Sequence, residues 1–380
     1  MSLRDVGTEP YPHSMSGGRR SDVEQPSLFT ELQPQSATKH DILAKYASAW
    51  GQILSKQDWC QDAWVVDGFA GPGRYGDGSP GSPLLLADAI LRWQQARSVD
   101  RPRFRFHLRL VERDHRAELE HAIASVSDDL DIQVCAEATF RDALPRLVEQ
   151  IGNDPAFYFI DPAGWAGAEF DLVEQAIAGR SKEVLINFMY DRLNEFAGVA
   201  RQVSEGSADA RVKGIADGIT RFFGTSEWID VILDDPGPRV REAQLLHLYA
   251  DQLRKRDAFA WSFRNKYADK NRTYYYLIHA TRSLTGLKIM KELMINADMA
   301  EPTLFDEIDF QAGFEKFKRE LQLRFGGGAP ALEKEVLAYV LQDTEYLPKQ
   351  MERALVELGA FLEEGRSGSR RIRNWRIPST

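Results

Sequence analysis

Five short apolar runs alternate with helical segments between residues 64 and 188, and this alternation constrains the fold more than any other feature of the sequence. Strands separated by helices pair in parallel through right-handed crossovers and are covered by helices on both faces. The sequence therefore predicts a parallel α/β sheet of the Rossmann-like type. The five runs lie at 64–67, 106–112, 132–136, 156–160 and 183–188.

The pattern changes after the fifth run. A long helical stretch over 192–252 precedes two β-rich runs at 259–267 and 273–281, and the polar residues 268–272 between those runs suit a hairpin loop. Five parallel strands closed by an antiparallel hairpin is the order of a class I methyltransferase sheet, whereas simple nucleotide-binding folds usually end parallel. We therefore expect a Rossmann-like methyltransferase domain over 36–325, with a helical insertion around 191–257.

The C-terminal segment reads as a separate small domain. Three glycines, Ala329 and Pro330 at 326–330 predict a linker. Two helices followed by a hairpin with a basic tip are typical of a winged helix, which we place at 331–380. The expected elements are helices at 332–341 and 347–358 and strands at 360–362 and 372–377, with the glycines and serines of 365–369 between the strands.

Composition excludes several classes of protein. Of the 380 residues, 43% are hydrophobic, which is enough for a folded core, but no run approaches the ~18 apolar residues that span a bilayer. The polar tail at 1–35 lacks the basic-then-apolar order of a signal peptide and is expected to be mobile. Cys60 and Cys135 are the only cysteines, and neither has a Cys or His neighbour at metal-ligand spacing. We expect a cytoplasmic protein without a metal site.

A glycine-rich turn follows the first apolar run. Its glycines let the backbone approach a ligand closely, and Asp67 can order the turn or contact the amino-acid part of a cofactor. NAD-binding chains place an acid ~20 residues after the glycines, whereas here Glu112 lies 39 residues after Gly73. The turn favours S-adenosylmethionine over NAD, and a plain structural turn is the alternative. The cofactor contacts expected here are Asp67, Gly68, Phe69, Ala70, Gly71 and Gly73.

Two further residues are candidate cofactor contacts. Glu112 ends the second run, where a carboxylate can accept both ribose hydroxyls. The alternative is an acid that caps the next helix, a role open to Asp114 as well. Thr139 follows the third strand and is expected, from topology alone, to border the adenine, but an ordinary loop residue fits equally well.

The fourth run ends in Asp161-Pro162-Ala163-Gly164-Trp165, which resembles the Asp-Pro-Pro-aromatic motif of methyltransferases that modify exocyclic amino groups. The Asp side chain and the prolyl carbonyl accept the amine hydrogens, so that the nitrogen lone pair can turn towards the methyl group, and the ring stacks on the base. Two departures stand out: Ala163 replaces the second proline, and the ring comes one residue late. We predict catalytic roles for Asp161, Pro162 and Trp165, with Asp161 also beside the cofactor. The alternative is an Asp-Pro turn that ends a strand.

Taken together, six segments between residues 38 and 297 resemble the three-Cys-motif partner proteins. These are methyltransferases named for their association with a radical-type protein that bears a three-cysteine motif. The resemblance implies the fold, S-adenosylmethionine as cofactor, and that protein as a partner. Family members more often carry Phe at the position of Ala163. The segments are Lys39-His40-Asp41-Ile42-Leu43, Asp67-Gly68-Phe69-Ala70-Gly71-Pro72-Gly73, Gly81-Ser82-Pro83, Ile160-Asp161-Pro162-Ala163-Gly164-Trp165, Leu185-Ile186-Asn187-Phe188 and Gly286-Leu287-Lys288-Ile289-Met290-Lys291.

Basic residues give the candidate substrate contacts. The net charge of −9 argues against a chain that coats DNA with its whole surface, yet five arginines and no acid lie between 366 and 376. For these arginines, the alternative is a solvated charged loop. For His40 it is a capping or surface role, and for Arg192 it is a position on a solvated helix. The candidate contacts to substrate or nucleic acid are His40, Arg192, Arg366, Arg370 and Arg371.

Three functions fit these features. The first is a methyltransferase acting on nucleic acid, on an amino nitrogen of a base. The second is a methyltransferase for a protein or small molecule, with the winged helix as a protein-interaction module. The third is a non-enzymatic cofactor sensor that docks on DNA. Asp161 favours the two enzymes over the sensor, and the arginines favour the first and third functions, so we predict the first.

Overall fold

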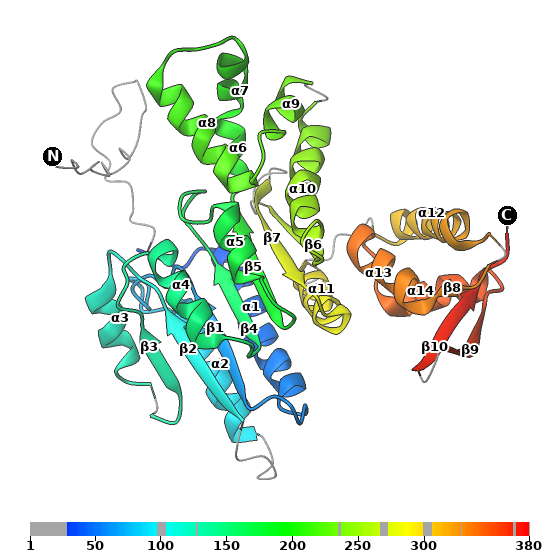
Figure 1. The fold of residues 1–380 in the computed structure, drawn as a ribbon, viewed down its shortest axis with the longest axis horizontal. Coiled ribbons are helices and arrows are strands. Elements are labelled where there is room, and N and C mark those ends of the chain that lie inside the picture. The colour runs from blue at the N-terminus through cyan, green and yellow to red at the C-terminus, as the bar shows by residue number, and fades with distance from the viewer. Residues whose placement is uncertain are drawn as a thin grey trace.

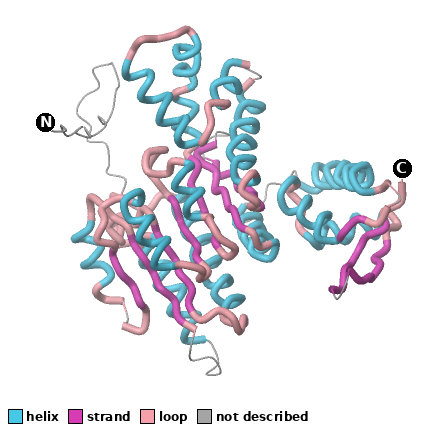
Figure 2. The backbone as a smooth tube through the Cα atoms, in the orientation of Figure 1, coloured by secondary structure: helices cyan, strands magenta, loops and turns pink. Residues whose placement is uncertain are grey.

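The computed structural model describes residues 29–96, 104–126, 128–234, 237–266, 273–298, 306–327, 329–367 and 370–379. Its centre is a seven-stranded sheet in the order β3-β2-β1-β4-β5-β7-β6, flanked by helices (Figures 1 and 2). β1 to β5 run parallel, and β7 is antiparallel to both β5 and β6. The strands are β1 (Asp62–Asp67), β2 (Arg105–Leu110), β3 (Asp131–Val134), β4 (Ala156–Ile160), β5 (Lys182–Phe188), β6 (Phe259–Lys266) and β7 (Thr273–Thr281).

The sheet confirms the Rossmann-like prediction, including the antiparallel hairpin that closes it. The strand order is the one expected for a class I methyltransferase. The hairpin loop predicted at 268–272 lies outside the described residues. The helices of this part are α1 (Pro34–Leu54), α2 (Ser82–Ala96), α3 (Arg116–Ile123), α4 (Phe140–Ile151), α5 (Phe170–Ala176), α6 (Tyr190–Glu195), α7 (Ala197–Ser204), α8 (Ala210–Phe223), α9 (Trp228–Leu233), α10 (Pro238–Arg254) and α11 (Leu284–Asp298).

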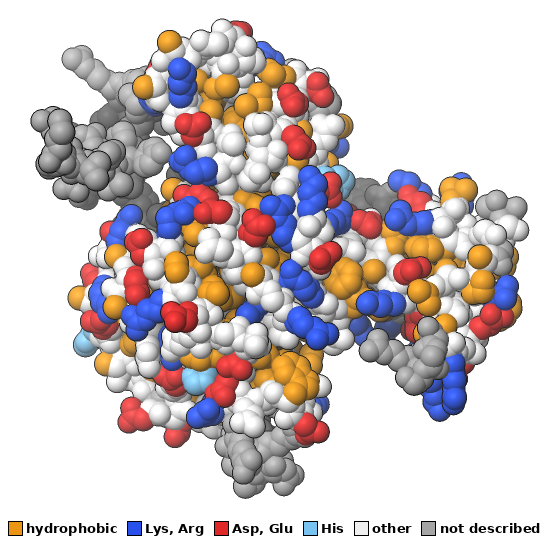
Figure 3. Space-filling view, in the orientation of Figure 1, with side chains coloured by type: hydrophobic (Ala, Val, Ile, Leu, Met, Phe, Trp, Pro, Cys, Tyr) orange, Lys and Arg blue, Asp and Glu red, His pale blue; other side chains and the backbone are white. Residues whose placement is uncertain are grey.

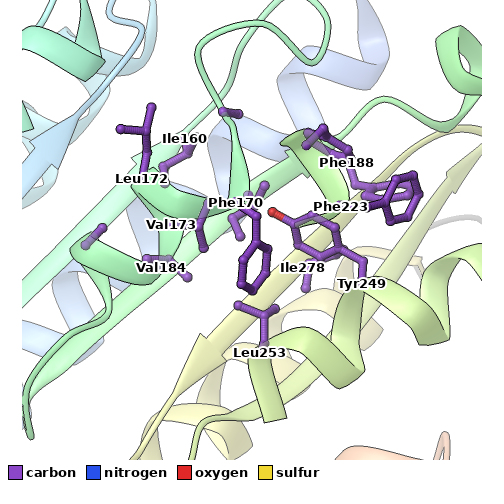
Figure 4. Close-up of a cluster of buried hydrophobic side chains, with 14 of the residues drawn as sticks. Ile160, Phe170, Leu172, Val173, Val184, Phe188, Phe223, Tyr249, Leu253 and Ile278 are labelled. Atoms are coloured by element: carbon purple, nitrogen blue, oxygen red, sulfur yellow. The ribbon is translucent and has the colours of Figure 1, made fainter. Parts of the chain in front are cut away.

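Alternation along β4 separates two cores on the two faces of the sheet. Phe157 and Phe159 pack with α1, α2 and α11, whereas Tyr158 and Ile160 pack with α4, α5 and the helices of the insertion. Because successive strand residues point to opposite faces, a run that is apolar throughout fits a strand buried on both sides. Figure 4 shows how Tyr249 of α10 enters the second core beside Phe170, Phe188 and Phe223. The helical insertion is thus part of the core rather than an appendage.

The segment before α1 differs from the prediction of a mobile tail over 1–35. Residues 1–28 lie outside the described part, but Phe29 packs against the ring of His115 at 5.3 Å between centroids, and its carbonyl accepts a hydrogen bond from the Gly76 amide at 2.7 Å. The Leu32 amide donates to Asp77 at 3.3 Å. Residues 29–32 therefore cross the loop that follows β1.

In its described residues, the C-terminal unit contains three helices and a three-stranded antiparallel sheet in the order β8-β10-β9. The predicted boundary at 326–330 is wrong, because Phe314, Phe317 and Leu321 of α12 belong to the core of this unit. The glycine-rich segment therefore connects α12 to β8 within one unit instead of separating two domains. The elements are α12 (Asp306–Phe325), β8 (Ala331–Leu332), α13 (Glu333–Asp343), α14 (Pro348–Glu357), β9 (Phe361–Ser367) and β10 (Arg370–Arg376).

The two parts meet at the end of α13, beside β6 and α11 (Figure 1). The buried Lys291 of α11 donates to the carbonyls of Val340 at 2.8 Å and Thr344 at 2.6 Å, and its Nζ lies 5.0 Å from the centre of the Trp261 ring. Arg254 adds a hydrogen bond to the Gln342 carbonyl at 3.3 Å and an ion pair with Asp343 at 2.9 Å. A helix end leaves its last carbonyls without intrahelical partners, and here the neighbouring part supplies the donors. We call this contact the α13 joint.

Removing the lysine should loosen the α13 joint. Replacing Lys291 by Met removes its hydrogen bonds to buried carbonyls, of which Val340 keeps the Thr344 hydroxyl and Thr344 keeps the Trp261 indole as donors, at a cost of about 1–3 kcal/mol. We therefore expect Lys291→Met to lower the unfolding free energy by that amount in urea denaturation. The matched control on the same helix is Lys288→Met, because Lys288 is exposed and pairs only loosely with Glu292 at 3.9 Å. Equal urea midpoints for the two variants would contradict a stabilising role for the joint.

Candidate active site

A cavity of about 1030 Å³ opens where the parallel strands end. The turns after β1, β2, β3, β4 and β5 contribute to it, together with the start of α1 and the start of β7. In open α/β sheets, ligands bind in the crevice beyond the carboxyl ends of the strands. The predicted residues that line the cavity are His40, Gly68, Phe69, Ala70, Gly71, Gly73, Glu112, Thr139, Asp161 and Pro162.

The turn after β1 depends on its glycines for two reasons. Gly71 and Gly73 have φ of +62° and +81°, which side chains rarely adopt. A Cβ on Gly73 would also lie 2.8 Å from that of Ala122, and one on Gly68 would lie 2.9 Å from the ring of Phe140. The turn therefore keeps its backbone close to the cavity, with no side chains between.

Asp67 lies buried beneath this turn. Its Oδ1 accepts a hydrogen bond from the Phe69 amide at 3.1 Å, while its Oδ2 has no hydrogen-bond partner among the described residues. Burial raises the pKa of Asp67 to about 7, although hydrogen bonds from Ser82 and Phe69 favour the ionised form. A cationic group bound next to it would stabilise the carboxylate.

Glu112 connects the β1 turn to the start of α3. Its two oxygens accept hydrogen bonds from the amides of Gly71 at 2.7 Å, Asp114 at 2.8 Å and His115 at 2.8 Å. Glu112 thus bonds amides of the turn before α3 and does not cap the helix, whose N-cap, His115, has no side-chain cap hydrogen bond, while Asp114 pairs with Arg113 at 2.8 Å. An ionised carboxylate has about four acceptor sites, so one stays available to a ligand in the cavity.

Thr139 also has a local role. Its hydroxyl oxygen accepts from the amide of Asp142 at 3.2 Å, which makes Thr139 the N-cap of α4. The same hydroxyl lies 2.6 Å from the Asp142 carboxylate. Thr139 lines the cavity, but its polar atom is directed to the helix start.

Asp161 lies at the end of β4 with a donor on each carboxylate oxygen. Lys39 of α1 forms an ion pair with Oδ2, and Asn187 of β5 donates to Oδ1 at 2.5 Å. The side chain of Asp161 is 18% exposed and that of Lys39 is 8% exposed. The carboxylate is therefore held from the protein side and still faces the cavity.

The structure does not bring Trp165 to the cavity. Its ring packs edge-on against Phe196 at 5.1 Å between centroids, and its Nε1 lies close to Gly218 of α8. Trp165 is thus not in place to stack on a substrate base, and Tyr274 and Tyr275 of β7 are the aromatic residues on that side of the cavity.

His40 lines the cavity at the start of α1. Burial, followed by the charge of the adjacent Lys39, lowers its pKa to about 4, against the opposing effect of Asp161. The imidazole is therefore neutral at neutral pH. Arg192 belongs to α6, but its side chain lies outside the described residues.

Sequence reasoning missed several residues of the cavity. Lys39 lies next to His40 in the sequence but was given no role. Asn187 could have been found, because it is a polar residue inside an otherwise apolar run. Phe29, Tyr75 and the two tyrosines of β7 had no signal, because only the tertiary fold brings them here. The missed residues that matter most for the chemistry are Lys39, Asn187, Tyr274 and Tyr275.

The hairpin of the C-terminal unit presents unpaired charge. Arg366 of β9 lies directly opposite Arg371 of β10; both are exposed, and neither has an ion-pair partner within the described parts of the chain. Arg373 pairs with Glu333 at 3.2 Å and Arg376 with Glu363 at 2.7 Å. The side chain of Arg370 lies outside the described residues. Elsewhere on the face in Figure 3, acidic and basic side chains are interspersed.

Two negative observations belong with the site. Within the described ranges, no cluster of three or more His, Cys, Asp or Glu side chains could hold a metal ion. None of the described helices combines the length and the apolar character needed to cross a bilayer.

No family model matches the sequence, and no curated protein matches it. Among solved structures, cofactor-bound Rv0187 from MTB matches at 14% identity and a TM-score of 0.33, over 68% of this chain and 84% of that one. An O-methyltransferase from Bacillus cereus, in complex with SAH, matches at 14% identity and a TM-score of 0.33, over 66% of this chain and 83% of that one. A Legionella pneumophila protein, LPL1258, matches at 11% identity and a TM-score of 0.37, over 68% of this chain and 91% of that one. At these identities and TM-scores, the matches carry no conclusion about the activity of this chain.

Proposed function

We propose that the protein is an S-adenosylmethionine-dependent methyltransferase that modifies an amino group of a nucleic-acid base. The observation that carries the proposal is the position of Asp161. Its carboxylate faces the same cavity as the glycine-rich turn, at the ends of neighbouring strands β4 and β1. A cofactor on the turn and an amine on Asp161 would thus share one cavity.

The residues around the turn fit the cofactor. Asp67 has a buried oxygen without a partner among the described residues, which suits the ammonium of the methionine part, and Glu112 retains one acceptor site for a ribose hydroxyl. The glycine turn offers backbone with no Cβ in the way. S-adenosylmethionine supplies an activated methyl group as a sulfonium.

Asp161 suits an uncharged amine. The ion pair with Lys39 offsets the charge of the carboxylate, which reduces its preference for a cation such as a lysine ammonium. Asp161 and the Pro162 carbonyl can accept the two hydrogens of an exocyclic amino group, which aims the nitrogen lone pair. A base reaches such a cavity only when it is unstacked from its neighbours, and the partly exposed ring of Tyr274 on the cavity wall favours a flipped base.

The C-terminal unit supports nucleic acid as the substrate. Its element order, helix, strand, two helices and a hairpin, with β10 between β8 and β9, supports the winged helix that we propose for this unit. In such domains the hairpin lies along the phosphate backbone. Like charges directly opposite each other in a hairpin are destabilising, so Arg366 and Arg371 are better explained by an anionic ligand than by stability.

The resemblance to the three-Cys-motif partner proteins adds a partner to the proposal. A radical-type protein with a three-cysteine motif would act with this chain, and its presence is a variable to include in assays.

One assay tests the proposed activity. The protein is incubated with methyl-labelled S-adenosylmethionine and with RNA or genomic DNA from cells that lack it, and digested nucleosides are analysed by mass spectrometry. We expect the label on an exocyclic nitrogen. Label on added protein or on a small molecule instead would favour the second function, and cofactor binding without transfer to any acceptor would favour a sensor.

Cofactor binding should depend on Glu112. We expect Glu112→Ala to weaken S-adenosylmethionine binding by about 1–3 kcal/mol in calorimetry, through lost charge-assisted hydrogen bonds and a looser β1 turn. Glu118→Ala is the matched control, because Glu118 is exposed on α3, outside the cavity. Binding of NAD with no response to S-adenosylmethionine would contradict the cofactor.

A further inference from the structure

The ion pair behind Asp161 supports a further inference, which rests on the proposed function. Lys39 occupies one acceptor site on Oδ2 and Asn187 one on Oδ1. An ionised carboxylate has about four such sites, so each oxygen keeps one for a substrate. The two donors determine which way these remaining sites point.

Both donors come from rigid elements. Lys39 stands on α1, whose residues Ile42, Leu43 and Tyr46 are fully buried in the core beneath the sheet. Asn187 is buried in β5, which pairs with β4 on one side and β7 on the other. The direction of the Asp161 carboxylate is therefore set by a helix and a strand rather than by a loop.

The burial of Lys39 distinguishes two roles. A lysine that blocked the carboxylate would lie between Asp161 and the cavity and would be the more exposed partner. Here Lys39 is the less exposed of the two, at 8% against 18%, and its Nζ lies 5.6 Å from the centre of the Tyr275 ring. Lysine is rarely so buried unless it is paired, and although Lys39 reaches the cavity wall, its ammonium is directed to the Asp161 carboxylate.

We infer that Lys39, together with Asn187, is a positioning residue for Asp161. It holds the carboxylate so that its free acceptor sites face the cavity and the substrate amine. Misplacing a reacting group by about 1 Å can cost a hundredfold in rate, so the loss should appear in the turnover rate rather than in binding.

The test compares two lysines of the same helix. Lys39→Met removes the pair, whereas Lys45→Met removes an exposed lysine that bonds to Asp41 at 2.7 Å. The readouts are methyl transfer from saturating S-adenosylmethionine to RNA or genomic DNA from cells lacking the protein, and calorimetric affinity for S-adenosylhomocysteine. We expect Lys39→Met to lower the maximal rate about a hundredfold. The half-saturating nucleic-acid concentration and the cofactor affinity should stay within about threefold, and Lys45→Met should match the wild type.

A conservative variant separates positioning from folding. Lys39→Arg restores the charge and a donor, so we expect it to recover about a tenth or more of the wild-type rate. If Lys39→Met and Lys39→Arg lose cofactor affinity and melting temperature alike, the lysine maintains the fold and the inference is overturned.

Other outcomes are equally decisive. A wild-type rate in Lys39→Met would remove Lys39 from the mechanism. A faster rate, or saturation at lower nucleic-acid concentration, would identify Lys39 as a competitor of the substrate amine, which also overturns the inference. An inactive wild-type protein on both nucleic acids would refute the proposed function itself, and the inference with it.

Discussion

Replacing Asp161 by Asn should reduce methyl transfer at least a thousandfold while cofactor affinity changes by only a few-fold. The physical reason is the loss of one of the two amine acceptors, since the new amide presents hydrogens where the substrate does. The measurement is label transfer to nucleic acid, with calorimetry of S-adenosylhomocysteine binding on the same samples.

Asp88→Asn is the matched control, because Asp88 is exposed on α2, where it pairs with Arg92 at 2.9 Å. Asp161→Asn also leaves Lys39 buried without its counter-charge, so melting temperatures must be recorded to show that the variant is folded. Full turnover in a folded Asp161→Asn variant would show that this carboxylate does not address the substrate.

Removing the charge at the hairpin end should weaken nucleic-acid binding about a hundredfold near physiological salt. Each phosphate contact contributes about 0.9 to the slope of log affinity against log salt on duplex DNA. Replacing Arg366, Arg370 and Arg371 together by Ala should therefore flatten that slope by about two to three units. Fluorescence anisotropy across a salt series measures both quantities, and cofactor binding should be unaffected.

The same hairpin offers a control with equal charge. The pair Arg366→Ala and Arg371→Ala removes two arginines that have no ion-pair partner in the described part of the chain, whereas Arg373→Ala and Arg376→Ala removes two that already pair with glutamates. We expect the first pair to change the slope by about two units and the second by clearly less. Equal slopes in wild type and both double variants would exclude the hairpin from substrate binding and favour a protein-docking role.

The sheet could be predicted from the sequence because its signals are local. Runs such as 156–160 are apolar at every position, as strands covered on both faces must be, and the turn after β1 carries its own glycines. The extent of the C-terminal unit was missed because it depends on contacts between segments distant in the sequence. Only packing shows that α12 belongs there, since the glycines after it suggested a linker.

The candidate site was predictable where a residue ends a strand. Glu112 and Asp161 line the cavity, and Asp67 lies buried beneath its first turn, because strand ends of a parallel sheet meet at one edge. Lys39 was missed because its contact with Asp161 spans 122 positions of the chain. Trp165 was misplaced because sequence order does not tell which way a ring turns after a glycine.

The α13 joint sets the distance between the C-terminal hairpin and the cavity. Lys291 and Arg254 hold the carbonyl end of α13 against the sheet, so the hairpin cannot swing freely relative to the cavity. Under the proposed function, a base would be modified only when it lies at a fixed distance along the nucleic acid from the phosphates bound by the hairpin. Nucleic acids shortened one nucleotide at a time from the end that the hairpin binds should keep full turnover down to a threshold length and lose it abruptly below that length.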